Sequence, residues 1–400
     1  MAPARTTAAS GRLQTAPAGV LSRPRILRIR SLPAFLARAV FARPYDTVLL
    51  PVTTEHRIAL LPGDGVGPEV IVEARKALDA LGLPLRWTDL PWGSAYWHEH
   101  GQMMAQDAIE VLRGHDAILM GAVGDPSVPD PVALWGYILK MRQELDLWAN
   151  VRPARLLEGI PCPLAGRGPA DIDMLFVREN TEGEYSGIGG RAHAGLPLEV
   201  ATETSVFTRE GTNRILRYAF GLAAERRGVL TSATKSNASR YTYVLWDEIA
   251  EEVAADYPGV RYERVLVDAL SARMIRNPDS LDVVVASNLF GDILTDIAAA
   301  LQGGLGMAAS ANIAPGGEVP GLFEPVHGSA PDIAGQGIAN PSGAVWSASL
   351  MLDHLGEGEA AGRLLRALEA VCQEGPRTRD VGGTATTVEV GDAIAARVAG

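Results

Sequence analysis

Short apolar segments alternate with long helical patterns over most of this 400-residue chain, and this alternation limits the folds that it can adopt. Strands that alternate with helices favour a layered α/β architecture. Because 400 residues exceed one compact core, we expect two domains. The expected strands lie at 58–61, 117–120, 175–177, 229–233 and 281–286, and the expected helices at 68–81, 132–144, 208–226, 242–256 and 290–301.

Composition excludes several protein classes. No apolar run approaches the length of a membrane span, so a membrane protein is not expected. Cys162 and Cys372 are too few for a disulfide framework, which favours a reducing compartment, the cytoplasm. The total net charge is −11, and residues 1–50, with eight arginines and one acid, contribute +7. The remainder is therefore strongly acidic, which argues against nucleic-acid binding.

Residues 1–51 differ in composition from the rest of the chain. They are rich in alanine, arginine, serine and proline and nearly free of acids, as in an organellar transit peptide. The alternative is a start codon assigned too far upstream, with translation beginning near Val52. We favour the second interpretation because the composition resembles that of a GC-rich bacterial gene. In both cases residues 1–51 are left out of the fold prediction.

A glycine-rich turn, Gly63-Asp-Gly-Val-Gly67, lies between the first expected strand and the first expected helix. This context is typical of dinucleotide-binding motifs, but the spacing is G-x-G-x-G rather than G-x-G-x-x-G. Pro68 also removes an amide that a pyrophosphate would need. We therefore predict a tight structural turn near a cofactor, not a Rossmann fingerprint.

Asp292 and Asp296 follow the strand at 281–286 and are four residues apart. In a helix this spacing places both carboxylates on one face, where they repel unless a cation or a basic partner lies between them. Asp268 ends another apolar run. Three carboxylates suit a hard divalent cation, Mg²⁺ or Mn²⁺. For an isolated pair, two solvated aspartates on an amphipathic helix are the alternative.

Three arginines form a second candidate group. Arg142 lies in a helical segment, Arg152 follows ten residues later, and Arg178 ends an apolar strand. A guanidinium at a strand end can bind a carboxylate through two parallel hydrogen bonds. Each arginine alone is more often a surface salt-bridge residue. Together with a cation site, the three predict a small dicarboxylate ligand.

Lys235 and Tyr185 are candidates for proton transfer. Lys235 follows the buried strand at 229–233, a position that suits a general base, and a solvent-reaching surface lysine is the alternative. Tyr185 lies in a glycine-flanked loop and is a candidate proton donor, with a packed aromatic side chain as the alternative.

A segment rich in glycine, proline and polar residues, 323–341, has the composition of an ordered ligand-binding loop. His327 is suited to stack on or hydrogen-bond a nucleobase, and Gly328, Ser329 and Ala330 would bring the backbone close. Asp332 could accept hydrogen bonds from ribose hydroxyls. Its charge would repel a 2′-phosphate, which favours NAD over NADP.

In combination, these motifs resemble the β-decarboxylating dehydrogenases, the family of isocitrate, 3-isopropylmalate, homoisocitrate and tartrate/D-malate dehydrogenases. The resemblance covers residues 56–396. The motifs occur in family order: Leu61-Pro-Gly-Asp-Gly-Val-Gly-Pro-Glu-Val70, Arg142 with Arg152, Arg178 with Tyr185, Lys235, Asp268, Asn288-Leu-Phe-Gly-Asp-Ile-Leu-Thr-Asp296 and the loop containing His327.

The resemblance implies a two-domain, isopropylmalate dehydrogenase-like α/β fold that is not Rossmann. The large domain would comprise 52–147 and 303–400, and the small domain 148–302 would hold metal, substrate and dimer contacts. NAD would lie along the loop from His327 to Asn340. NADP-dependent relatives have lysine and tyrosine where this chain has Asp332 and Ile333, which again favours NAD.

The resemblance also implies a homodimer with shared active sites. Lys235 and Asp268 would reach into the partner's site, whereas Asp292, Asp296, Tyr185 and the three arginines would come from one chain. The implied cofactors are NAD and Mg²⁺ or Mn²⁺; an additional K⁺ and assembly beyond a dimer are left open.

The subfamily motifs are closest to tartrate and D-malate dehydrogenases, which implies oxidation or oxidative decarboxylation of a small 2-hydroxy dicarboxylate, such as D-malate to pyruvate and CO₂. They are Trp92-Gly-Ser-Ala-Tyr96, Gly121-Ala-Val-Gly-Asp-Pro-Ser-Val-Pro-Asp130, Leu134-Trp-Gly136, Glu182-Gly-Glu-Tyr-Ser-Gly-Ile-Gly-Gly-Arg-Ala-His193 and Lys235-Ser-Asn-Ala238. Tyr137-Ile-Leu-Lys140 departs from that group's pattern.

Two alternatives remain. A 3-isopropylmalate dehydrogenase would use the same chemistry, and Ile138 and Leu139 would suit its branched substrate. A non-catalytic regulatory subunit would belong to a different class of protein. Such subunits usually lose catalytic residues, whereas Tyr185, Lys235 and the three aspartates are all present.

Overall fold

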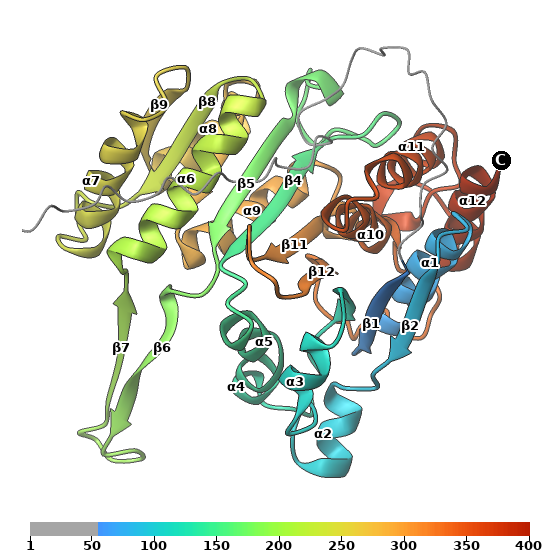
Figure 1. The fold of residues 1–400 in the computed structure, drawn as a ribbon, viewed down its shortest axis with the longest axis horizontal. Helices are drawn as coiled ribbons and strands as arrows, with labels where there is room; N and C mark the ends of the chain where they lie inside the picture. The colour runs from blue at the N-terminus through green and yellow to red at the C-terminus, as the bar shows by residue number, and fades with distance from the viewer. Residues whose placement is uncertain (1–54) are drawn as a thin grey trace, which may run out of the picture. The chain divides into compact units, whose positions relative to one another are not determined.

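A ten-stranded mixed sheet with helices packed around it organises residues 55–400, the part of the chain that the computed structural model describes (Figure 1). The strand order is β2 (Leu85–Asp89), β1 (His56–Gly63), β3 (Ala117–Ala122), β12 (Gly321–Pro325), β11 (Ala309–Ile313), β4 (Ala149–Arg155), β5 (Asp173–Glu179), β10 (Val283–Ala286), β8 (Val229–Thr234) and β9 (Arg261–Leu266).

The five strands predicted from apolar runs are all present, as β1, β3, β5, β8 and β10. Among them, β3 and β10 are free of polar side chains and buried at every residue, as expected for strands of a sheet that helices cover on both faces. Around them, the pairs on either side of β11 and β4 are antiparallel, whereas the outer pairs are parallel. This mixed sheet is not a Rossmann sheet.

Strands from different parts of the chain occupy different halves of the sheet. The half from β2 to β11 is built from residues 56–122 and 309–325, and the half from β4 to β9 from residues 149–286. This order is compatible with a large domain of 52–147 and 303–400 and a small domain of 148–302, but the domain boundaries stay a prediction.

The predicted helices are present as α1 (Gly67–Asp79), α6 (Arg209–Glu225), α7 (Thr242–Ala254) and α9 (Asn288–Leu301). The predicted helix at 132–144 is divided into α4 (Asp130–Ala133), a π-helical turn (Leu134–Ile138) and α5 (Leu139–Glu144). The remaining α-helices are α2 (Ser94–His100), α3 (Ala108–Arg113), α8 (Val267–Arg276), α10 (Ser342–His354), α11 (Gly358–Glu374) and α12 (Thr387–Ala399).

A separate two-stranded ribbon, β6 (Gly183–Ala192) and β7 (Val200–Val206), extends away from the sheet (Figure 1). Its outer part carries apolar side chains that remain exposed, among them Ile188 and Leu198, the latter 75% exposed. Within residues 55–400, no helix combines the length and the apolar composition that crossing a membrane requires.

Candidate active site

The helix α9 begins at Asn288, one residue after the buried strand β10, and carries Asp292 in its second turn and Asp296 in its third. The predicted strand, turn and helix are therefore confirmed, and the i, i+4 spacing places both carboxylates on one face. The side chain of Asp292 is 43% exposed, and Asp296 is exposed. Both are therefore accessible to a ligand.

Arg178, at the end of β5, is 2% exposed and holds the start of α9. Its Nη1 donates to Asp292 Oδ1 over 2.5 Å. Its Nε and Nη2 donate to Asn288 Oδ1 over 3.0 and 2.7 Å. Asn288 was not predicted as a site residue, although its place in the motif with Asp292 was a usable signal. One guanidinium thus fixes the first turn of the helix that carries both aspartates.

The other two arginines are also buried, each about 6% exposed, so none of the three is a surface salt-bridge residue. Arg152, on β4, donates through Nη1 to Thr295 Oγ1 over 2.5 Å, and its Nη2 lies 3.8 Å from Asp292 Oδ1. Arg142, on α5, donates through Nη2 to the buried carboxylate of Glu324 over 2.9 Å. The Nε atoms of Arg142 and Arg152 are buried and have no hydrogen-bond partner among residues 55–400. Positive charge with unused donors fits an anionic ligand.

The charges of this cluster and burial shift the pKa values of the two aspartates in opposite directions. Burial raises the pKa of Asp292, but the charges of Arg178, Arg152 and Arg142 outweigh it and hold that pKa below its ordinary value. Burial and the neighbouring charge of Asp292 raise the pKa of Asp296. Burial, with the charge of Arg178, lowers the pKa of Arg152 to about 9. Asp292 is therefore the firmly ionised member of the pair, and Asp296 lacks a cationic partner of its own.

Tyr185, near the start of β6, lies beside this cluster. The Cζ of Arg178 is 5.9 Å from the centre of the Tyr185 ring. Burial and the charge of Asp292 raise the pKa of Tyr185 above its ordinary value. The phenol is therefore protonated at neutral pH, as a proton donor requires.

Lys235 and Asp268 lie together, apart from the α9 aspartates. Lys235 Nζ donates to Asp268 Oδ1 over 2.7 Å, and this hydrogen bond lowers the pKa of Asp268. Their side chains are 32% and 65% exposed. Within residues 55–400, no group of three or more His, Cys, Asp or Glu side chains lies close enough to hold a metal ion. A single chain thus does not bring Asp268 to Asp292 and Asp296, and their union in a dimer stays a prediction.

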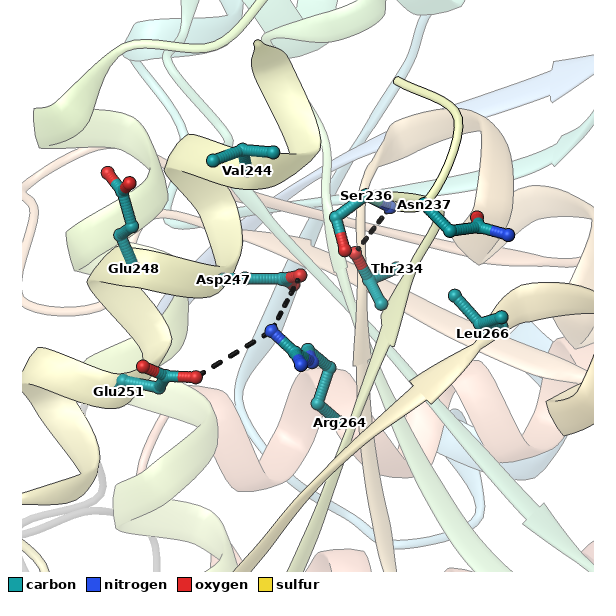
Figure 2. Close-up of a pocket in the computed structure, with 9 residues that line it drawn as sticks. All are labelled: Thr234, Ser236, Asn237, Val244, Asp247, Glu248, Glu251, Arg264 and Leu266. Carbon is teal, nitrogen blue, oxygen red and sulfur yellow. Dashed lines mark hydrogen bonds and ion pairs between the residues drawn. The ribbon is translucent and has the colours of Figure 1, made fainter. Parts of the chain in front are cut away.

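A polar cavity of about 520 Å³, not predicted from the sequence, lies at the carboxyl ends of β8 and β9, where Lys235 and Asp268 follow in the chain (Figure 2). Arg264 Nη1 contacts Asp247 Oδ2 over 3.4 Å and Glu251 Oε1 over 3.7 Å. The lining residues are Thr234, Ser236, Asn237, Val244, Asp247, Glu248, Glu251, Arg264 and Leu266. Ligands commonly bind outside the carboxyl ends of parallel strands.

The segment 323–341 packs against the glycine turn that follows β1. Val66 N donates to Ser329 O over 2.9 Å, and a Cβ on Gly65 would approach Ser329 O to 2.0 Å. His327 Nδ1 contacts Gly328 O at 2.9 Å, whereas its Nε2 is buried without a partner. Burial lowers the pKa of His327, so the imidazole is neutral. The glycine turn and the segment 323–341 are therefore in close backbone contact, and the Nε2 atom of His327 has no hydrogen-bond partner among residues 55–400.

The remaining predicted residues of this loop differ in their contacts. Gly328 and Asp332 are exposed, and Ala330 has a left-handed backbone conformation with φ of 41°. Asn340 is buried and donates to Asp380 Oδ2 over 3.0 Å. An unpredicted residue, Glu69, accepts hydrogen bonds from the amides of Gly335 and Gly337 over 2.5 and 3.1 Å and so fastens the loop to α1.

The glycine turn itself is structural, as predicted. The buried carboxylate of Asp64 accepts hydrogen bonds from Ser94 N and Oγ, both over 2.8 Å, and from Gly124 N over 3.0 Å. Gly63 has φ of +70°, and a Cβ there would meet Ala122 O at 2.0 Å. The acid of this turn is thus used to hold the turn against Ser94 of α2 and Gly124 after β3.

Comparison with known proteins gives a consistent result. The family model described as isocitrate/isopropylmalate dehydrogenase matches residues 57–394. A probable tartrate dehydrogenase/decarboxylase of Agrobacterium vitis is 52% identical over 352 residues, which cover 86% of this chain and 98% of that protein. The D-malate dehydrogenase (decarboxylating) of Escherichia coli is 51% identical over 350 residues, 84% of this chain and 97% of that protein.

Relatives with other substrates in their names are also similar. A 3-isopropylmalate dehydrogenase of Thermobifida fusca is 48% identical over 348 residues, 86% of this chain and 98% of that protein. The crystal structure of isocitrate dehydrogenase from Methylococcus capsulatus superposes with a TM-score of 0.80 at 38% identity, covering 86% of this chain and 100% of that chain.

The two α9 aspartates should respond differently to neutralisation. Asp292→Asn is expected to weaken Mn²⁺ binding by more than about tenfold. It should also lower the free energy of unfolding by about 1–3 kcal/mol, because the buried Arg178 loses its anionic partner. Asp296→Asn should weaken Mn²⁺ binding without this loss of stability. Electron paramagnetic resonance and urea unfolding measure both quantities. Unchanged Mn²⁺ affinity in both variants would contradict the metal assignment.

Proposed function

Since this chain belongs to the isocitrate/isopropylmalate dehydrogenase family, we propose that it is an NAD- and divalent-metal-dependent dehydrogenase that oxidises tartrate or D-malate, with decarboxylation of D-malate to pyruvate and CO₂. The relatives with 51–52% identity are named as a dehydrogenase/decarboxylase and as a decarboxylating dehydrogenase, and both names combine oxidation with loss of CO₂. The location of the protein in the cytoplasm, a reducing compartment that its two cysteines favour, stays a prediction.

One observation carries the proposal: three buried arginines form a cluster in which Arg178 and Arg152 contact Asp292 of α9 and Arg142 contacts Glu324. Arg142, Arg152 and Arg178 share two anionic partners, Asp292 and Glu324. Two of the guanidinium groups retain buried donors without acceptors. A substrate carboxylate would accept those hydrogen bonds and balance the excess positive charge. The arginines would thus hold the carboxylate that departs as CO₂.

The donor set on α9 fits a hard divalent cation. Asp292 and Asp296 offer only carboxylate oxygens. Burial and the charge of Asp292 raise the pKa of Asp296, and a bound cation would relieve the repulsion between the two carboxylates. These two residues would hold Mg²⁺ or Mn²⁺ together with Asp268 of a second chain. When bound, the metal ion would polarise the substrate hydroxyl and the ketone derived from it.

Lys235 and Tyr185 are proposed to move the protons. Lys235 would accept the proton of the substrate's 2-hydroxyl group as hydride leaves the adjacent carbon. Its hydrogen bond to Asp268 would keep it oriented. Tyr185 would return a proton to carbon after CO₂ leaves, a role supported by its raised pKa and its place beside Arg178.

The loop from His327 to Asn340 is proposed to bind NAD, which accepts the hydride. His327, whose side chain is partly exposed, would stack on the adenine base, and the backbone of Gly328, Ser329 and Ala330 would lie close to the cofactor, with Ser329 packed against the glycine turn. Asp332 is exposed and free to accept hydrogen bonds from ribose hydroxyls while excluding a 2′-phosphate. Asn340 would act by holding the end of the loop, since its amide is bound to Asp380.

A homodimer is proposed because the functional groups of one chain form two separate sets. Lys235 and Asp268 pair with each other and remain accessible, away from Asp292 and Asp296. The exposed apolar residues of the β6–β7 ribbon, such as Ile188 and Leu198, are suited to burial against a second chain. The second chain would supply the lysine and the third aspartate.

A 3-isopropylmalate dehydrogenase remains the alternative, because a protein with that name is 48% identical. The predicted apolar pocket for its branched substrate has less support. Ile138 and Leu139 are only 8% and 9% exposed and belong to the same buried cluster as Trp92 and Tyr137. Little of their surface is therefore open to an isopropyl group.

The substrate class is tested by turnover of D-malate, L-tartrate, meso-tartrate and 3-isopropylmalate, each with NAD and Mn²⁺. We expect kcat/KM for D-malate or a tartrate to exceed that for 3-isopropylmalate by more than about tenfold. The reverse order would assign the chain to the alternative, and no turnover of any acid would refute the proposal.

Tyr185→Phe tests the proton donor. Because the variant keeps the ring and removes the hydroxyl, it should slow decarboxylation by about 10²–10⁴-fold. Hydride transfer should slow much less, so that oxaloacetate is released from D-malate. Rapid-quench product analysis compares the two steps. Equal slowing of both steps would exclude this role.

A further inference from the structure

We propose that Glu184 is a positioning residue, which fixes the proton donor Tyr185 relative to the aspartates of α9. This inference rests on the proposed function of Tyr185, Asp292 and Asp296. Glu184 itself belongs to none of the predicted site groups, and its side chain is directed to other protein atoms rather than to the arginine cluster.

The carboxylate of Glu184 joins three points around the start of α9. Its Oε2 accepts from the backbone amide of Leu289 over 3.1 Å, in the first turn of the helix. Its Oε1 accepts from Tyr243 Oη over 2.6 Å and from Ser287 Oγ over 3.2 Å. The first amides of a helix have no partner within it and carry partial positive charge, so a carboxylate is the acceptor best suited to this position.

The hydrogen bonds of Glu184 to the start of α9 also determine where Tyr185 lies. Glu184 and Tyr185 are adjacent in β6, within the irregular stretch between Gly183 and Ile188 where the pairing with β7 shifts register. With Glu184 bound to the start of α9, the next residue along the chain is held beside Arg178, whose Cζ lies 5.9 Å from the centre of the Tyr185 ring. Arg178 in turn binds Asp292. The proposed proton donor Tyr185 and the proposed metal ligand Asp292 are therefore both held near the start of α9, the first through Glu184 and the second through Arg178.

Tyr243 holds the carboxylate of Glu184 in a fixed position. Its ring stacks on Phe290 of α9 with centroids 4.7 Å apart and an angle of 14°. Burial, followed by the charge of Glu184, raises the pKa of Tyr243 above its ordinary value, so its hydroxyl remains a donor. Tyr243 Oη also lies 2.6 Å from Ser287 Oγ. The acid is thus enclosed by groups from α7, β10 and α9.

Glu182 provides a matched comparison within the same segment. Its carboxylate also binds the start of a helix, accepting from Thr208 N over 2.9 Å and from Thr208 Oγ1 over 2.5 Å. That helix, α6, carries none of the proposed site residues. Loss of either acid removes a carboxylate at a helix N-terminus, but only Glu184 connects that terminus to the proposed active site.

The experiment compares Glu184→Leu, Glu184→Gln and Glu182→Leu in the full-length protein. For each variant we would measure the ratio of oxaloacetate to pyruvate formed from D-malate, the Mn²⁺ affinity by electron paramagnetic resonance, and the unfolding midpoint. Glu184→Leu should raise the product ratio and weaken Mn²⁺ binding by about tenfold or more. Glu184→Gln should restore most of both, because its amide oxygen can still accept from Leu289.

Glu182→Leu should lower the unfolding midpoint as Glu184→Leu does, with the product ratio and Mn²⁺ affinity of the wild type. Equal changes in both leucine variants would mean that Glu184 is only structural and would overturn the proposal. Unchanged Mn²⁺ affinity in Glu184→Leu would overturn it as well. The metal titration requires no turnover. If the wild type oxidises none of the acids, the proposed function fails while Glu184 is still tested.

Discussion

The ion pair between Arg178 and Asp292 is the interaction on which the rest of the site depends. A guanidinium that is 2% exposed needs an anionic partner, and Asp292 supplies it in the second turn of α9. The same contact ionises Asp292, connects β5 to α9 and leaves Arg152 and Arg142 with donors to spare. In the proposed function, stability and ligand binding would therefore be linked, because the charge that holds the helix start would also take part in binding the cation and the dicarboxylate.

Much of the fold could be predicted from hydrophobic patterning, for a physical reason. Strands such as β3 and β10 are covered on both faces, so they are continuous apolar runs. The strands β4 and β11 gave no such signal because they bury polar side chains. Asn150 donates to Ser310 Oγ over 2.7 Å and to Asn312 Oδ1 over 2.8 Å at the centre of the sheet. The π-helical turn at Leu134–Ile138 was not predicted either, because the sequence pattern was interpreted as one continuous helix over 132–144.

Site residues could be predicted where residues that are close together in the sequence carry the signal. The i, i+4 aspartates share one face of α9, where Arg152 and Arg178 contact Asp292, and the third arginine, Arg142, is buried with Glu324. Residues that act through long-range contacts could not be found in this way. Glu324 reaches Arg142 across 182 positions, and Glu69 reaches the loop at Gly335 across 266. Glu184 is similar, because nothing in the sequence indicates that its partner is the amide of Leu289.

The central claim is that two chains complete each site, with Asp292 from one and Asp268 from the other. Co-assembly of Asp292→Asn and Asp268→Asn subunits, each inactive as a homodimer, tests it most directly. In a shared arrangement each mixed dimer regains one intact site, so activity should return to about one quarter of wild type after equal mixing. If both aspartates served a site within one chain, every site would stay defective. Absence of recovered activity in verified mixed dimers would contradict the account.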